Sequence, residues 1–271
     1  MVPMNPIKTL IKGSVRALGF ELYPIFKPGK RLRNGRYALA PVRLSMEESL
    51  AHLKRLGYVP SLIVDVGAAE GTPPLLRTWP KIPTIWIEPL QEFGARLNNL
   101  AQKHPGRVVL AAAGEKSGRL AIHVHGDLFG SSLLQESDGE AADGRSREVP
   151  IIRLDDEVDL AKAGDAVLLK LDVQGAELQA LDGAPRLLKQ CEVVIMEVNF
   201  FNLQKGSPVL LDVLTYMKDR GFVAYDIFDG HNRPLDDALA QRDVLFVKEN
   251  GRFRRSHQWA AKGQREQVLG S

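Results

Sequence analysis

Cysteine is almost absent from this chain of 271 residues, since Cys191 is the only one. A single cysteine excludes an intrachain disulfide, and with it the small secreted domains that disulfides hold together. No apolar run reaches the roughly 18 residues that cross a bilayer. The sequence also has no Cys/His cluster of the zinc-binding type, no internal repeat and no nucleic-acid-binding motif. What remains is ordinary globular composition, with 44% hydrophobic and 25% charged residues.

Charge is distributed unevenly along the chain, although its net value is only +3. Residues 1–36 contain eight Lys and Arg against one Glu, a net of +7. Residues 250–271 contain five Lys and Arg against one Glu, a net of +4, so the middle of the chain carries −8. We predict a basic N-terminal helix and arm at 1–44, a folded domain at 45–249 and a basic, disordered tail at 250–271.

The basic N-terminal segment has a helical pattern that allows two interpretations. Over residues 6–22 apolar side chains recur at helical spacing, and Lys8, Lys12 and Arg16 line another face. Such a helix is typical of peripheral contact with an anionic membrane surface, in this chain through residues 6–36. The alternative is a helix that docks on the protein's own core. Nucleic acid is not an expected partner, because the body is acidic and has no suitable motif. We expect a cytoplasmic protein, peripheral at the inner membrane face under the first interpretation.

Strand-like and helix-like segments alternate through the middle of the chain. Strands are expected at 62–66, 82–87, 107–111, 120–124, 167–171, 193–197, 222–228 and 243–247, and helices at 44–58, 72–79, 90–103, 176–189 and 209–220. This order predicts an α/β fold with a doubly wound, mostly parallel sheet and an antiparallel strand near the C-terminus, where 243–247 closes the sheet. Residues 129–147 are polar and rich in Gly, Asp and Ser, which predicts a long loop.

Two features at the ends of the first two strands indicate a nucleoside-binding site. Ligands of open α/β sheets bind beyond the carboxyl ends of the strands. The first strand runs into Asp65-Val-Gly-Ala-Ala-Glu-Gly71, whose small residues let the backbone approach a ligand. Glu88 follows the second strand, twenty-three residues after Asp65, where a carboxylate can accept both hydroxyls of a ribose. The alternative is a tight turn at Gly67 and Gly71 with Glu88 as a solvated surface acid.

The glycine pattern distinguishes among nucleosides. A dinucleotide fold uses G-x-G-x-x-G, in which the second glycine admits a pyrophosphate, and Gly67-x-x-x-Gly71 lacks that arrangement. The acidic Asp65 suits a ligand that carries an amine. S-adenosylmethionine has an ammonium, a carboxylate and a ribose, so Asp65 would contact the ammonium through water while backbone amides near Gly67 hold the carboxylate.

Six blocks of the sequence, in this order, resemble the FkbM-type S-adenosylmethionine-dependent methyltransferases. They are Asp65-Val-Gly-Ala-Ala-Glu-Gly71, Glu88-Pro89, Ala112-Ala-Gly-Glu-Lys-Ser-Gly118, Ser131-Ser132-Leu133, Lys170-Leu-Asp-Val-Gln-Gly-Ala-Glu177 and Ile195-Met-Glu197. The resemblance covers about residues 45–248, and the block at 170–177 is the most specific. Ala69 and Gln174 depart from the pattern, since many members carry Asn and Glu there.

The resemblance implies a class I methyltransferase (Rossmann-like) fold that methylates a hydroxyl of a sugar or a natural product. It implies S-adenosylmethionine as the cofactor. The residues that it assigns to cofactor binding are Asp65, Gly67, Ala68 and Gly71 at the methionine end, Glu88 and Pro89 at the ribose, and Gly114 and Glu115 near the adenine, with Asp172 bordering the site.

The block at 170–177 also has a physical rationale. Lys170 and Asp172 alternate at the end of a strand and therefore point to the same face. Transfer of a methyl group to an alcohol requires loss of a proton, so a nearby base helps. Asp172 is the candidate base, and the alternative is a structural link to the first loop. Lys170 is expected to partner a carboxylate. Glu197 ends the neighbouring strand, and with Asp172 it could hold Mg²⁺ or simply bind a substrate hydroxyl. We favour the site without a metal ion, because no third ligand is evident.

Three further residues are candidates for the acceptor pocket. Ser131 and Ser132 would border it, although they could also be ordinary loop polarity. His231 lies in a turn after a strand, where it could act as a base or be solvent-exposed. The preferred function is a cytoplasmic S-adenosylmethionine-dependent O-methyltransferase for a saccharide or glycosylated metabolite, as in polysaccharide biosynthesis. The alternatives are a nicotinamide-dependent oxidoreductase, and a non-catalytic methyltransferase-like module recruited to membranes.

Overall fold

The computed structural model describes residues 42–138 and 144–269. The basic helix expected at 6–22 lies outside these residues. The chain divides into two units, one formed by residues 43–256 and the other by residues 1–42 and 257–271. In the second unit the structure describes one helix, α10 (Lys262–Leu269). The first unit, called the body below, contains every candidate site residue.

The body ends at Ser256, beyond the boundary that the sequence suggests at residue 249. The turn η2 (Arg252–Arg254) continues the fold past the last strand. Within it, the ring of Phe253 lies 5.7 Å from the rings of Tyr58 and Tyr225, measured between centroids. This aromatic packing ties the segment after the sheet to the body.

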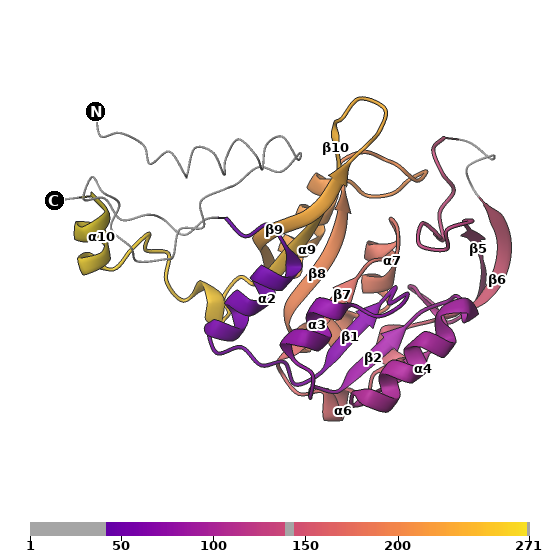
Figure 1. Cartoon of the computed structure of the whole chain (residues 1–271), viewed down its shortest axis with the longest axis horizontal. Helices are drawn as coiled ribbons and strands as arrows, with labels where there is room; N and C mark the ends of the chain where they lie inside the picture. Colours follow the sequence, from indigo (N-terminus) through magenta and orange to yellow (C-terminus); the bar gives the residue numbers. More distant parts are fainter. Residues whose placement is uncertain (1–41, 139–143, 270–271) are drawn as a thin grey trace, which may run out of the picture. The chain divides into compact units, whose positions relative to one another are not determined.

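A seven-stranded sheet forms the centre of the body, in the order β3-β2-β1-β7-β8-β10-β9 (Figure 1). Its strands are β1 (Ile63–Val66), β2 (Thr84–Ile87), β3 (Gly106–Val109), β7 (Val167–Leu171), β8 (Cys191–Asn199), β9 (Phe222–Asn232) and β10 (Leu239–Lys248). Neighbouring strands pair in parallel except at β10, which is antiparallel to both β8 and β9. The predicted doubly wound, mostly parallel α/β sheet is therefore confirmed. The prediction that 243–247 closes the sheet is wrong, because β10 lies between β8 and β9.

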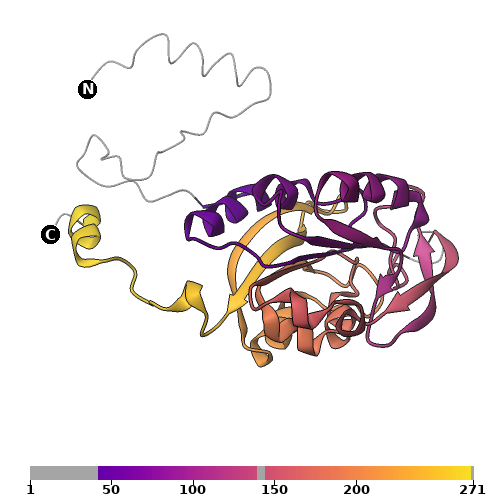
Figure 2. The same cartoon turned by 90° about the horizontal axis from the view of Figure 1, so that it is seen from below.

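Helices cover both faces of this sheet (Figure 2). On one face lie α2 (Met46–Arg55), α3 (Pro73–Thr78) and α4 (Gly94–Lys103), which follows the turn η1 (Gln91–Phe93). The helices later in the chain are α5 (Leu154–Glu157), α6 (Leu160–Ala163), α7 (Glu177–Asp182), α8 (Pro185–Gln190) and α9 (Leu210–Asp219). Alternate residues of β1 belong to different cores: Ile63 packs with Leu50 of α2, and Val64 packs with Leu187 of α8. Burial of both faces explains why the central strands β1 and β7 are mostly apolar in the sequence. No helix among the described residues is long and apolar enough to span a membrane.

A second, three-stranded sheet stands beside the first, in the order β4-β6-β5. Its strands are β4 (Ala112–Ala113), β5 (Gly118–Val124) and β6 (Arg145–Ile152). The long loop expected at 129–147 is therefore too long by three residues, since β6 begins at Arg145 and pairs with β5. The charged residues that open β6 are exposed, so its sequence lacks the apolar alternation of a typical strand.

Two helix predictions also need correction. The helix expected at 176–189 is two helices, because Pro185 lacks an amide proton and restricts Ala184, so the chain breaks between α7 and α8. Thr72 precedes α3 as expected but does not cap it, since its hydroxyl donates to Asp65 instead. Ser45 does cap α2: its Oγ accepts from the backbone amide of Glu48 at 3.3 Å.

Candidate active site

A cavity opens at the carboxyl ends of β1, β2, β7 and β8, with about 810 Å³ of empty space, its open mouth included. The residues that line it are Val66, Gly67, Ala69, Ile87, Glu88, Pro89, Leu90, Phe93, Ala111, Ala112, Ala113, Ile122, Leu128, Phe129, Ser131, Ser132, Leu133, Asp172, Val173, Gln174 and Glu197. The position is the one that the sheet topology predicts for a ligand.

The first side of the cavity, called the β1–β2 rim, consists of residues 66–71 and 87–90. Its carboxylate is Glu88, which is buried except where it lines the cavity. Glu88 Oε2 accepts from the amide of Ala69 at 2.8 Å, and Oε1 accepts from the amide of Leu90 at 2.9 Å. Burial raises the pKa of Glu88, while these two amides act in the opposite direction. Each oxygen keeps a lone pair, so the carboxylate can still accept two hydroxyls of a ribose.

Gly67 lets the β1–β2 rim lie directly against the end of β7. Its φ of +68° is in the left-handed region, and a Cβ at this position would lie 1.8 Å from the backbone oxygen of Asp172. The amide of Asp172 donates to the oxygen of Val66 at 3.1 Å. The two loops therefore touch through their backbones, which is the structural link considered for Asp172. Only glycine fits at position 67.

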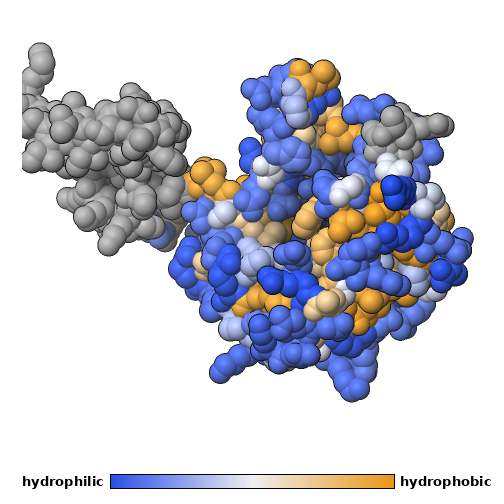
Figure 3. Space-filling view, turned by 45° about the vertical axis from the view of Figure 1, so that its right-hand side comes forward, coloured by the Kyte–Doolittle hydropathy of each residue, from blue (hydrophilic) through white to orange (hydrophobic). Residues whose placement is uncertain are grey.

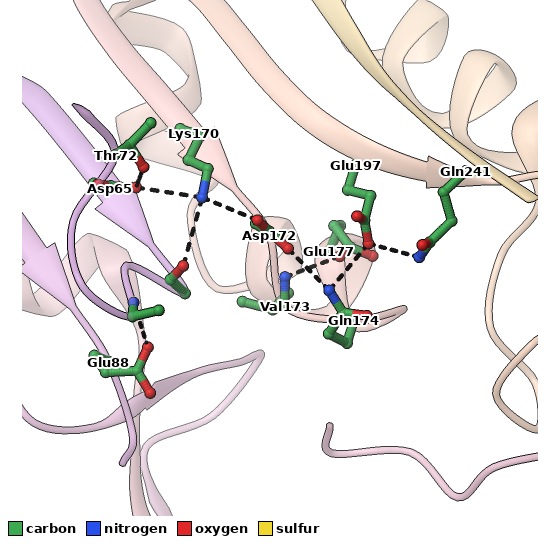
Figure 4. Close-up of polar contacts among 12 residues, drawn as sticks. Asp65, Thr72, Glu88, Lys170, Asp172, Val173, Gln174, Glu177, Glu197 and Gln241 are labelled. Carbon is green, nitrogen blue, oxygen red and sulfur yellow. Dashed lines mark hydrogen bonds and ion pairs between the residues drawn. The ribbon is translucent and has the colours of Figure 1, made fainter. Parts of the chain in front are cut away.

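Lys170 is buried between two carboxylates beneath the cavity (Figure 4). Its Nζ lies 3.2 Å from Asp172 Oδ2 and 3.6 Å from Asp65 Oδ1. Burial alone would lower the pKa of Lys170, but the charges of Asp172 and Asp65 outweigh it and raise the pKa above its usual value. The ammonium thus stays charged and holds Asp172 in place, as predicted for a partner of a carboxylate.

Asp65 does not line the cavity, although the sequence suggests a ligand contact. It is fully buried, and its Oδ1 accepts from the hydroxyl of Thr72 at 3.0 Å. Its second oxygen, Oδ2, has no hydrogen-bond partner among the described residues. Burial raises the pKa of Asp65 in spite of the charge of Lys170. Asp65 therefore supports the site from below through Lys170.

The second side of the cavity, called the β7–β8 rim, consists of residues 170–177 and 197–199. Asp172 is 35% exposed and lines the cavity with Gln174 and Glu197. Figure 4 shows the amide of Gln174 between the two carboxyl groups: its Nε2 lies 3.1 Å from Asp172 Oδ1 and 3.1 Å from Glu197 Oε1. Gln241 of β10 donates to the same Glu197 oxygen at 2.7 Å. Side-chain amides therefore hold this rim together.

Acidic groups crowd behind the β7–β8 rim. Glu177 is buried, and its Oε1 accepts from the amides of Val173 and Gly175, but burial still raises its pKa to about 7. Burial and the charge of Asp172 raise the pKa of Asp243 to about 6. Glu197 lies opposite Asp243 in the strand pairing, and burial together with the charges of its acidic neighbours raises its pKa well above the usual range.

The third side of the cavity is apolar. Ala111, Ala112, Ile122 and Phe93 line it, and Phe129 contributes a ring that is 59% exposed and lies 5.4 Å from the ring of Phe93. Figure 3 shows apolar surface interrupting an otherwise hydrophilic face of the molecule. An apolar, aromatic wall suits a flat heterocycle such as adenine.

Backbone strain is concentrated around this cavity. Five non-glycine residues of the described chain have left-handed φ, and three of them line the cavity: Ala69 at 44°, Leu128 at 70° and Gln174 at 53°. Such conformations cost about 1 kcal/mol or more and persist where the surrounding structure enforces them. Their clustering supports the identification of the cavity as the functional site.

The structure brings most of the predicted site residues together. Gly67, Glu88, Pro89, Ser131, Ser132, Asp172 and Glu197 line the cavity, while Ala68, Gly71 and Lys170 lie just behind it. Ser131 and Ser132 also fix their own loop, since Ser131 Oγ accepts from the amide of His125 and Ser132 Oγ donates to the oxygen of Gln174. The sequence therefore identified both rims.

Besides Asp65, three predicted residues lie neither in the cavity nor directly behind it. The Glu115 side chain is 62% exposed and pairs with Lys116, because the short strand β4 leads the chain away into the small sheet. Gly114 packs against Ile151, where a Cβ would lie 2.5 Å from a side-chain carbon. His231 is exposed on β9. The structure supports no ligand contact for these residues.

Sequence reasoning missed the apolar wall and the amides of the β7–β8 rim. Phe93 and Phe129 carried no motif, and Gln174 was noted only as a departure from a pattern. Gln241 is separated from Glu197 by 44 residues, and only the pairing of β8 with β10 brings them together. The one local signal in the sequence was Gly175 beside Gln174, which indicates a tight turn there. Among the described residues, no group of three or more His, Cys, Asp or Glu could hold a metal ion.

The fold and this cavity define a class I, Rossmann-like methyltransferase. A family model described as the methyltransferase FkbM domain matches residues 65–224. This is more than half of the chain, and it includes both rims. The chain therefore belongs to the FkbM methyltransferase family and is an S-adenosylmethionine-dependent methyltransferase. This membership favours the methyltransferase over the oxidoreductase and the non-catalytic module.

Solved structures of other methyltransferases are similar to the chain at low sequence identity. Magnesium protoporphyrin IX methyltransferase from Synechocystis, with bound S-adenosylmethionine, is 14% identical with a TM-score of 0.41, covering 92% of this chain and 99% of that one. Aeropyrum pernix fibrillarin, with natively bound S-adenosylmethionine, is 14% identical with a TM-score of 0.41, covering 74% of each chain. An rRNA methylase from Streptococcus thermophilus is 14% identical with a TM-score of 0.41, covering 77% of this chain and 99% of that one. No curated protein sequence matches the chain.

Proposed function

We propose that the protein transfers a methyl group from S-adenosylmethionine to a hydroxyl of a saccharide or of a glycosylated natural product. The observation that carries this proposal is the partly exposed carboxylate of Asp172, which faces the cavity while the buried Lys170 holds it from behind. Bound S-adenosylmethionine supplies an electrophilic methyl group. Asp172 can accept the proton that the hydroxyl loses when its oxygen attacks.

The β1–β2 rim and the apolar wall fit the cofactor. Glu88 offers two carboxylate oxygens for ribose hydroxyls, and its backbone donors fix its orientation. The backbone near Gly67 and Ala68 can approach the methionine carboxylate. The wall around Phe93 and Phe129 can hold the adenine, in the place that the sequence assigned to Glu115. Alignment of cofactor and acceptor in one cavity supplies much of the lowering of the barrier.

The acceptor in this proposal is a small molecule or a glycan and not a nucleic acid. Asp172 and Glu197 line the part of the cavity that the cofactor contacts leave free, and Asp243 and Glu177 lie behind them. The residues that line the cavity include the carboxyl groups of Asp172 and Glu197 and no Lys or Arg, so the cavity favours a neutral acceptor with hydroxyls over one with phosphates. A saccharide supplies such hydroxyls.

The proposal is tested with labelled methyl donor. The full chain is incubated with S-adenosylmethionine labelled in its methyl group and with a cell extract, and the labelled product is identified by mass spectrometry. We expect a saccharide-containing product with one added methyl group on oxygen. Asp172→Asn should lower its formation by about 10²–10⁴-fold, as expected for loss of a general base. Asp219→Asn, a matched change at an exposed position of α9, should leave it unchanged. A labelled nucleic acid or protein would contradict the proposal.

We further propose that the protein is cytoplasmic and meets an anionic membrane surface through residues 6–36. The net charge of +7 over residues 1–36 supports this, since each Lys or Arg near an anionic surface contributes about 1 kcal/mol. Sedimentation with vesicles of phosphatidylglycerol should recover the full chain, and vesicles of phosphatidylcholine should not. Reversing the charge of Lys8, Lys12 and Arg16 should abolish recovery. Equal binding to both kinds of vesicle would contradict the proposal.

A further inference from the structure

Gln174 is a neutral side chain that joins Asp172 and Glu197, the two acidic groups of the β7–β8 rim that line the cavity. Its amide nitrogen lies at equal distances of 3.1 Å from Asp172 Oδ1 and Glu197 Oε1 (Figure 4). A primary amide has two N–H groups, and this geometry commits one to each carboxyl group. Asp172 and Glu197 are therefore fixed relative to each other by a single side chain.

The backbone holds the Gln174 side chain in this position. Its φ of 53° is left-handed, a conformation that few non-glycine residues adopt. The backbone oxygen of Gln174 accepts from the hydroxyl of Ser132 at 2.7 Å. Glu177 accepts from the backbone amides of the two residues that flank Gln174, Val173 and Gly175. The loop is thus tied down from two directions, and the strained residue points its amide between the carboxyl groups.

The two carboxyl groups have unlike surroundings. Asp172 pairs with Lys170, whose charge favours a carboxylate. Among the described residues no cation lies at hydrogen-bond distance from Glu197; instead its Oε1 accepts from two neutral amides, those of Gln174 and Gln241. Burial raises the pKa of Glu197, and the charges of Asp172 after β7, Glu177 on α7 and Asp243 on β10 raise it further, while Lys170 on β7 acts in the opposite direction. When Glu197 is neutral, Oε1 is its carbonyl oxygen, because Oε1 accepts from both amides. The proton of the neutral carboxyl group therefore lies on Oε2.

A carboxylate and a carboxylic acid side by side match a pair of hydroxyls. One hydroxyl donates to the carboxylate of Asp172, and a second accepts from the Oε2 proton of Glu197. We propose that Gln174 is a positioning residue that holds Asp172 and Glu197 beside each other, so that they bind two neighbouring hydroxyl groups of the methyl acceptor. The inference rests on the proposed O-methyltransferase function and narrows its acceptor to a compound with adjacent hydroxyls.

The first test measures hydroxyl binding without any methyl transfer. The full chain is loaded with S-adenosylhomocysteine, and saturation-transfer NMR compares cis-cyclohexane-1,2-diol with cyclohexanol. We expect the diol to bind about tenfold more tightly in the wild type, since a second hydrogen bond to a charged or acidic group contributes about 1.4 kcal/mol. Gln174→Met, which keeps the length but has no donor, should remove the difference. Gln179→Met, a matched change at an exposed position of α7, should keep it.

The second test uses the labelled product of the methylation experiment. For Gln174→Met we expect KM for the acceptor to rise about tenfold and the basic limb of the kcat/KM profile to move to higher pH, because Glu197 loses a donor that favours its charged form. A role confined to folding of the loop would leave the pH profile in place. Affinity for S-adenosylhomocysteine, measured by calorimetry, should change by less than about threefold.

The outcomes separate the two proposals. The wild type could bind the diol preferentially although no methylated saccharide forms. In that case the proposed reaction is wrong, but the inference that Asp172 and Glu197 bind two neighbouring hydroxyls is retained. If the methylated product forms but Gln174→Met behaves like Gln179→Met in diol binding, KM and pH profile, the inference is overturned. A parallel loss of cofactor affinity and diol binding in Gln174→Met would also overturn it, because it would show a structural role.

Discussion

The two polar rims of the cavity differ in what holds their acidic groups. On the β1–β2 rim, main-chain amides of Ala69 and Leu90 hold Glu88, the carboxylate of this rim that lines the cavity. On the β7–β8 rim, side chains hold Asp172 and Glu197, with Gln174 between them. Main-chain donors stay in place when side chains change, whereas a side-chain network changes with each substitution. The first rim therefore suits a ligand common to many enzymes, and the second suits one that varies between them.

The largest effect is expected from a substitution at the point where the two rims touch. Gly67→Val should lower the free energy of unfolding by about 3 kcal/mol or more, because it combines left-handed backbone with a Cβ that overlaps the oxygen of Asp172. Urea denaturation measures the change. Gly118→Val is the matched control, since a Cβ there meets nothing within 4 Å, and it should cost no more than about 0.5 kcal/mol. Equal stability of the two variants would show that the rims are not in contact.

The next effect tests the β1–β2 rim as the cofactor side. Glu88→Ala should weaken binding of S-adenosylhomocysteine by about 100-fold, since the ribose loses hydrogen bonds to a charged group. Isothermal titration calorimetry measures the affinity. Glu115→Ala removes the exposed acid that the sequence placed near the adenine, and we expect a change of less than about twofold. A larger loss of affinity in Glu115→Ala than in Glu88→Ala would show that the cofactor does not bind at the β1–β2 rim.

A smaller effect is expected from the charge of Glu177 in the β7–β8 rim, which makes stability depend on pH. The pKa of Glu177 is raised from 4.5 to about 7, so the folded state binds its proton more tightly than the unfolded state does. Its contribution to stability is therefore present at low pH and is lost as pH rises from about 4.5 to 7. Glu177→Gln keeps an acceptor for the amides of Val173 and Gly175 and should be more stable than the wild type at pH 8, by about 3 kcal/mol at most. Urea denaturation at pH 5 and pH 8 should show a much larger gain at pH 8 than at pH 5.

The smallest effect lies outside both rims. His231 is exposed on β9 and does not line the cavity, so His231→Ala should change the rate of methyl transfer and the KM for the acceptor by less than about twofold. Kinetics with the labelled product measure both. A large rise in KM would show that His231 contacts the acceptor and that the acceptor site extends beyond the β7–β8 rim.

Local patterns were sufficient to find the strand ends that carry the site. Gly67, Glu88 and Asp172 each follow a short apolar run directly, and parallel strands bring their carboxyl ends to one edge. The same reasoning failed for Glu115, because it depends on β6, whose exposed, charged start does not look like a strand. It also failed for Gln241, whose contact with Glu197 requires the insertion of β10 between β8 and β9.

The sequence by itself determined the alternation of strands and helices, the family and the residues that end the central strands, because apolar periodicity and turn residues act over a few positions. The tertiary structure alone decided which of these polar groups meet and in what state of charge. Glu197 is an ordinary glutamate in the sequence. Its pKa is raised only because the fold buries it beside Asp172, Glu177 and Asp243, since desolvation and neighbouring charge come from residues distant in the chain.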